Sequence, residues 1–210
     1  MRSTTPFVRR HIFRLPLQKL FTTREFLLYG PRATIDQSLS RLVKKEVIVR
    51  VARGILVRYG SNLSKITPFD MAKAKAESFG KQIARWGGDI AHELGLIEKQ
   101  SKEHIFCVNG SSSSFKFGEM TIHLRKVCAR KMRFGENKAG KVLRALWHLG
   151  KFQVDAMCVD RSLRTCLRPD REEIRGSLCW LPTWLSNHFI NMVLHREAFL
   201  NYPPLEKIQV

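Results

Sequence analysis

The sequence predicts an α+β protein in two parts, and three observations support this prediction. The 210 residues are enough for one large domain or two small ones. Segments with the 3.6-residue period of an amphipathic helix are interspersed with short runs of β-branched and aromatic residues. The positive charge is concentrated in two blocks of the chain, which suggests two functional surfaces.

The charge balance is the unusual feature of the composition. The chain has 37 Lys and Arg against 18 Asp and Glu, a formal net charge of +19. More than half of this excess lies within residues 1–62, and most of the rest lies within 116–151. A surface this basic attracts polyanions, so nucleic acid is the first partner to consider and an anionic membrane the second. A generally cationic surface without a specific partner is the alternative.

Several classes of protein are disfavoured. No stretch approaches the roughly 18 apolar residues that a membrane-spanning helix needs. The first twenty residues have no uninterrupted apolar segment, so a secretory signal is not expected. The cysteines, at 107, 128, 158, 166 and 179, include no Cys-x-x-Cys pair. This spacing favours neither a disulfide framework nor a zinc finger, and we expect a cytoplasmic protein.

Three helical segments are expected near the N-terminus. Residues 8–15 mix apolar and basic side chains before Pro16, which limits any helix there. Thr22 or Thr23 can cap a short second helix that ends at Gly30-Pro31. In the third segment the apolar side chains share one helical face; they are Ile35, Leu39, Leu42 and Val43.

Two strands are expected next. Valines at 47, 49 and 51 alternate with other residues, and a second apolar run at 55–57 follows Gly54. Three helices and then a two-stranded ribbon are the element order of a winged helix-turn-helix. The third helix would then meet base edges and phosphates with Arg32, Thr34, Gln37, Ser38, Arg41 and Lys45. The ribbon would reach phosphates or the minor groove with Arg50 and Arg53. The alternative is a small helical domain with a solvated polar face.

The rest of the chain predicts a mixed α+β domain. Residues 61–68 are polar, contain a proline and suggest a linker, so we expect domains at 1–62 and 63–210. A helix should begin near Thr67 or Asp70 and continue to about residue 86, with a shorter one after it. Three strands are expected within 104–127, a helix within 137–151, and two helical segments split at Pro182.

No catalytic or metal site is apparent in the sequence. The serines at 111–114 lack the glycine spacing of a phosphate-binding loop, so a solvated hairpin loop is favoured. Asp155 and Asp160 are five residues apart, which is unsuitable for a two-metal centre. His188 and His195 share a helical face without a ligand partner at suitable spacing. We therefore expect a protein that is not an enzyme and has no cofactor or metal.

The segment FTTREFLLYGPRATIDQSLSRLVKKEVIVRVARGILVRYG, residues 21–60, resembles the N-terminal winged helix of AbiEi-type antitoxins. These are transcriptional regulators of bacterial type IV toxin–antitoxin pairs. The similarity continues more weakly through IAHELGL, KAGKVLRALWHLGK and LPTWLSNHF. Two departures stand out: Glu46 occupies a position where relatives usually have glycine, and Trp86-Gly87-Gly88 replaces a Pro-Ser-Gly-like turn.

The resemblance implies a repressor of its own promoter that binds duplex DNA, usually at inverted repeats. It also implies an antitoxin domain toward the C-terminus that opposes a nucleotidyltransferase-type toxin. A second basic face would extend the DNA contact or meet an acidic partner, and consists of Lys116, Arg125, Lys126, Arg130, Lys131 and Arg133. The competing hypothesis is a non-catalytic RNA-binding or ribosome-associated basic protein, for which this charge would be equally natural.

Overall fold

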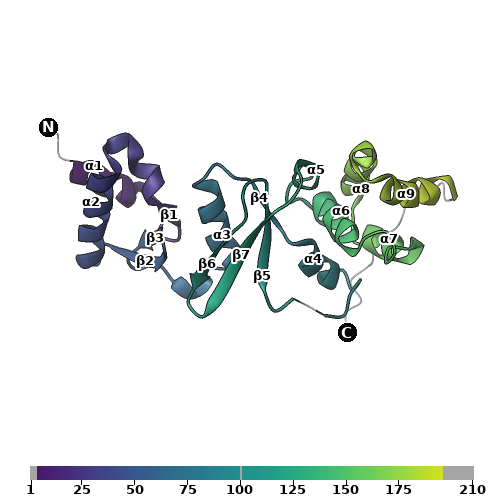
Figure 1. The fold of residues 1–210 in the computed structure, drawn as a ribbon, viewed down its shortest axis with the longest axis horizontal. Coiled ribbons are helices and arrows are strands. Elements are labelled where there is room, and N and C mark those ends of the chain that lie inside the picture. Colours follow the sequence, from purple (N-terminus) through teal and green to yellow (C-terminus); the bar gives the residue numbers. More distant parts are fainter. Residues whose placement is uncertain (1–3, 100, 196–210) are drawn as a thin grey trace. The chain divides into compact units, whose positions relative to one another are not determined.

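The computed structural model describes residues 4–99 and 101–195, and it shows a mixture of helices with two β-sheets (Figure 1). The predicted α+β class is confirmed. Two compact units are present: unit 1 comprises residues 1–83 and 103–126, and unit 2 comprises residues 84–102 and 127–210. This division differs from the expected boundary at residue 62, because the chain leaves unit 1 and returns to it.

The N-terminal part of unit 1 combines three helical segments with a three-stranded sheet. The helical segments are α1 (Thr4–Arg14), the 3-10 helix η1 (Thr23–Tyr29) and α2 (Arg32–Lys44). The strands are β1 (Phe21–Thr22), β2 (Ile48–Ala52) and β3 (Ile55–Arg58), paired antiparallel in the order β1-β3-β2. The start of η1 is fixed by the Glu25 carboxylate, which accepts a hydrogen bond from the Thr22 backbone N–H at 2.8 Å.

One hydrophobic core holds these elements together. Its buried members are Val8, Ile12, Phe21, Phe26, Ile35, Leu39, Leu42, Ile48 and Leu56. The apolar face predicted for residues 32–46 is therefore confirmed, with Val43 half-buried at its margin. Because α2 contributes three residues to this core, burial fixes the rotation of the helix about its axis.

The connection from α2 to β2 is a Schellman motif. The Glu46 N–H donates to the Val43 carbonyl and the Val47 N–H donates to the Leu42 carbonyl, both at 3.0 Å. This motif places Glu46 in the left-handed region, with φ of 54°, where glycine is the favoured residue. The departure noted at Glu46 therefore lies at a strained position, which determines how the chain enters β2.

The rest of unit 1 is built around a second sheet. Its elements are the short 3-10 helix η2 (Leu63–Lys65), α3 (Pro68–Glu77), β5 (His104–Val108), β6 (Ser113–Phe117) and β7 (Met120–Lys126). With β4 (Ile83–Arg85), the strand order is β4-β5-β7-β6. The three strands expected within 104–127 are confirmed; β5 runs parallel to β7, whereas β6 runs antiparallel to it.

Two expectations for this region are wrong. The helix expected to continue to about residue 86 ends at Glu77, because Gly80 turns the chain with φ of 68° and strand β4 follows. Residues 61–68 are not a free linker: Ile66 is 8% exposed and packs in the core between the two sheets. That core joins Ala52, Ile55 and Val57 to Met71, Phe106, Val108 and Ile122. A boundary at residue 62 would cut through it.

Unit 2 is helical. It contains α4 (Gly87–Glu93), α5 (Ala129–Met132), α6 (Lys138–Leu149), α7 (Ala156–Arg164), α8 (Arg168–Gly176), η3 (Leu178–Trp180) and α9 (Thr183–His195). The helix expected within 137–151 and the split at Pro182 are confirmed, whereas α7 was not expected. Helices α4 and α6 approach closely at Gly87, where an added Cβ would lie 2.5 Å from the Arg144 carbonyl oxygen.

Replacing Glu46 with glycine tests the strain at the end of α2. We expect Glu46→Gly to raise the free energy of unfolding by about 1 kcal/mol, because glycine adopts the left-handed conformation without a Cβ penalty. The control is Lys44→Gly, on the exposed face inside the helix, which should lower stability by a similar amount. Urea denaturation followed by circular dichroism measures the stability of both variants. Destabilisation by Glu46→Gly would contradict the assignment of a strained left-handed conformation to Glu46.

Candidate nucleic-acid interface

The outward face of α2 carries most of the residues proposed to contact DNA. Arg32, Thr34, Gln37 and Arg41 are exposed along the helix, and Lys45 is exposed immediately after it. The residues most directly opposite the core follow the spacing i, i+4, i+7 and i+11: they are Ala33, Gln37, Ser40 and Lys44, all exposed. Ser40 and Lys44 were not among the predicted contacts, although counting outward from the apolar set would have placed them on this face.

Ser38 is wrongly assigned to the DNA-contacting set. Its side chain is 2% exposed and faces α1. The Ser38 hydroxyl donates to the Thr34 carbonyl at 2.9 Å and lies 2.9 Å from the Thr5 hydroxyl oxygen. Ser38 therefore joins α2 to α1. A polar side chain on a helix is not necessarily on its solvent face, because a neighbouring helix can satisfy its hydrogen bonds.

Among the described residues, Arg32 is the one predicted α2 residue that forms an ion pair. Its Nε lies 3.4 Å from the Asp36 carboxylate, one helical turn further on, and both side chains are about half exposed. An exposed pair of this kind contributes little to stability, so Arg32 remains available to a phosphate that offers a stronger contact.

The β2–β3 ribbon presents Arg50 and Arg53 to solvent. Gly54, with φ of 79°, completes the tight turn at its tip. The tip is held against α3, because the Lys75 ammonium donates to the Arg53 carbonyl at 3.2 Å. Burial, and then the neighbouring Arg53 charge, lower the pKa of Lys75. The Arg53 side chain is thus presented from a fixed backbone.

Helix α1 adds cations that are not among the predicted contacts. Arg9 and Arg10 are exposed and line a groove together with Arg41 and Lys45 of the α2 end. The available signal was the composition of α1, TTPFVRRHIFR, which contains no acidic residue. These four cations lie in the same unit as the exposed face of α2.

The second basic face does not form within one unit. Lys116, Arg125 and Lys126 belong to unit 1, whereas Arg130, Lys131 and Arg133 belong to unit 2. Continuity in sequence suggested one surface, but the chain crosses between units after Lys126. In unit 1, Arg125 lies 3.6 Å from the Glu103 carboxylate.

The cations of the unit 2 group lie over tryptophan rings. Arg130 and Lys131 lie 5.5 and 5.2 Å from the centroid of the Trp147 ring, and Arg133 lies 3.9 Å from that of Trp180. Such contacts stabilise a fold by covering aromatic surface with a cation. Their geometry gives these residues a packing role.

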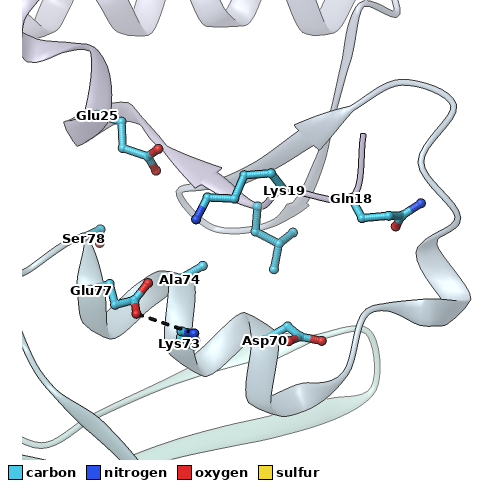
Figure 2. Close-up of a pocket in the computed structure, with 9 residues that line it drawn as sticks. Gln18, Lys19, Glu25, Asp70, Lys73, Ala74, Glu77 and Ser78 are labelled. Carbon is cyan, nitrogen blue, oxygen red and sulfur yellow. Dashed lines mark ion pairs between the residues drawn. The ribbon is translucent and has the colours of Figure 1, made fainter. Parts of the chain in front are cut away.

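A cavity of about 300 Å³ in unit 1 is lined by both carboxylates and lysines (Figure 2). Figure 2 shows the Glu25 and Glu77 carboxylates on opposite sides, with the Lys19 side chain extending between them. Glu25 is used at the start of η1, Asp70 accepts from the Thr67 N–H at 2.9 Å, and Glu77 pairs with Lys73 at 3.9 Å. No group of three or more metal-ligating side chains occurs in the part of the chain that the structure describes. Glu25 and Asp70 therefore act at the starts of helical segments, and Glu77 forms an ion pair along α3.

A model of a protein family described as a family of unknown function (DUF6088) matches residues 8–174. The chain belongs to this family. The DUF6088 match covers α2, the ribbon and both sheets. No curated protein and no solved structure matches the chain. Among the described residues of this DUF6088 protein, no helix has the length and apolar character needed to cross a membrane.

The contact between Ser38 and Thr5 can be tested by measuring the stability of a variant that lacks the Ser38 hydroxyl. We expect Ser38→Ala to lower the free energy of unfolding by about 1 kcal/mol, since it removes a partner from the half-buried Thr5 hydroxyl. Ser40→Ala is the matched control on the exposed face and should leave stability nearly unchanged. Thermal unfolding measures both variants; equal effects would show that Ser38 does not have this linking role.

Proposed function

We propose that residues 4–58 form a winged helix-turn-helix and that the protein is a sequence-specific, non-catalytic repressor that binds double-stranded DNA. The observation that carries this proposal is the outward face of α2. It combines a base-reading amide, Gln37, with the Ser40 hydroxyl and the cation Lys44, on a helix whose rotation the core fixes. Gln can form two hydrogen bonds to adenine, and basic side chains contact guanine or phosphate.

The arrangement of elements supports the proposal. A helix, a short strand, two further helical segments and a β-ribbon follow in order, and β1 completes the sheet beside β3. In a winged helix, the third helical segment enters the major groove and the ribbon lies along the adjacent backbone. Here these roles would belong to α2 and to the ribbon that carries Arg50 and Arg53.

The electrostatics are consistent with a polyanionic partner. Residues 1–62 contain only three acidic residues, which are Glu25, Asp36 and Glu46. Two of them have structural roles: Glu25 fixes the start of η1 and Asp36 pairs with Arg32. The uncompensated cations would supply the non-specific, salt-dependent part of DNA affinity.

The biological role that we propose rests on the resemblance to AbiEi-type antitoxins. The protein would act in the cytoplasm as the antitoxin of a type IV pair and repress its own promoter at inverted repeats. The toxin that it opposes would be of the nucleotidyltransferase type. Unit 2, with its own helical core, is the part to which we assign the antitoxin function.

Two exposed aromatic rings surrounded by cations favour RNA as the second candidate partner. Phe13 is 49% exposed, and Phe79 is 50% exposed with the Arg24 guanidinium 4.1 Å from its ring centroid. Unpaired bases stack on such rings, whereas duplex DNA keeps its bases paired.

A mobility-shift comparison tests the proposal. The full chain is titrated against the duplex immediately upstream of its gene, a scrambled duplex of equal length and a structured RNA, at two salt concentrations. We expect a preference of about a thousandfold for the upstream duplex over the scrambled one. Equal binding to both duplexes would contradict sequence-specific binding and would indicate only non-specific attraction by a charged surface. Tighter binding to the RNA would indicate that RNA is the partner.

The variant Gln37→Ala identifies the reading helix. We expect it to weaken binding to the upstream duplex by roughly 1–3 kcal/mol and to leave scrambled binding unchanged. Lys99→Ala, an exposed position in unit 2, is the control. If Gln37→Ala binds the upstream duplex with wild-type affinity, Gln37 does not contribute to recognition of the DNA sequence.

A further inference from the structure

We propose that the groove between α1 and α2 binds the sugar–phosphate backbone of the duplex whose bases meet the outward face of α2. The inference rests on the proposed function and deepens it by separating two sets of residues. Arg9, Arg10, Arg41 and Lys45 determine affinity, whereas Gln37 and its neighbours on the outward face determine sequence preference.

The position of the groove follows from the register of α2. Ser38, Arg41 and Lys45 are spaced by three and four residues, so they lie along one flank of the helix. Ser38 contacts Thr5 of α1, which shows that this flank faces α1. Arg41 and Lys45 continue the same flank beyond that contact, and they line the groove with Arg9 and Arg10. The outward face, by contrast, is centred on Gln37, Ser40 and Lys44.

The groove has the size and charge for a phosphodiester chain. It is a cavity of about 750 Å³ open to solvent, and no acidic residue lines it. Its four cationic side chains are all exposed, and none has an ion pair within residues 4–99 and 101–195. Four like charges gathered without a counter-charge repel one another, and an anionic ligand would relieve that repulsion.

The Phe13 ring in one wall of the groove restricts the Arg9 side chain. Phe13, which also lines the groove, has two guanidinium groups near its ring: Arg9 at 5.6 Å and Arg58 at 5.3 Å from the ring centroid. Arg58 is itself fixed, because its side chain donates to the Leu15 carbonyl at 2.9 Å. Stacking restricts Arg9 without using its hydrogen-bond donors, which remain available to phosphate oxygens. The exposed ring also offers an apolar surface to a sugar.

The salt dependence of binding tests this inference on the full chain. Each phosphate contact contributes about 0.9 to the slope of log K against log salt for B-DNA. The double variant Arg9→Ala/Arg10→Ala should therefore reduce the slope by about 2. The affinities for upstream and scrambled duplexes should fall by the same factor, so the preference between them should not change.

Two further double variants separate the groove from general charge and from misfolding. Lys99→Ala/Lys151→Ala removes the same charge from exposed positions in unit 2 and should leave the slope nearly unchanged. Arg9→Lys/Arg10→Lys keeps the charge and should retain the wild-type slope. Circular dichroism confirms that each variant is folded.

The outcomes that overturn the inference are distinct from failure of the proposed function. A slope reduced no more than in the unit 2 control excludes phosphate contacts in the groove. A loss confined to the upstream duplex would mean that the groove reads bases, and a loss seen only with RNA would exclude the DNA backbone. If the wild type binds both duplexes equally, the sequence-specific function fails, while the reduced slope still supports the groove.

Discussion

The burial of one face of α2 is the constraint on which the proposed interface depends. Ile35, Leu39 and Leu42 enter the same core as the first sheet, so the helix has only one rotation that buries all three. That rotation turns Ser38 toward α1, Arg41 toward the groove and Gln37 toward solvent. The proposed division of α2 into a groove-facing flank and an outward reading face would thus be a consequence of core packing.

Local pattern was sufficient to predict α2, β2 and β3, but not the two-residue strand β1. The apolar period of residues 32–46 and the alternating valines after it gave α2, β2 and β3, because in each case the signal lies within the element. The exposed positions of α2 were also largely predictable. Ser38 was not, since its polarity suggests solvent and only the approach of α1 shows that Thr5 is its partner.

What the sequence could not predict depends on contacts between distant segments. Residues 61–68 have the composition of a linker, yet Ile66 is buried in a core shared by residues from both sheets. The residues proposed for the second basic face show the same effect: residues 116–133 are continuous in sequence but divide between unit 1 and unit 2. The groove that Arg9 and Arg10 line could not be predicted either. It forms only because Arg41 and Lys45, which are distant in sequence, lie beside them in the fold.

The most direct test of the central claim is a photo-crosslink from the outward face of α2. A benzophenone amino acid is placed at Ser40, which is exposed and lies at the centre of the proposed reading face, or at Arg175, which is exposed on α8 of unit 2. The full chain is then irradiated with the upstream duplex. We expect covalent protein–DNA adducts from position 40 and essentially none from position 175. Adducts from position 175 alone would show that α2 does not face the DNA.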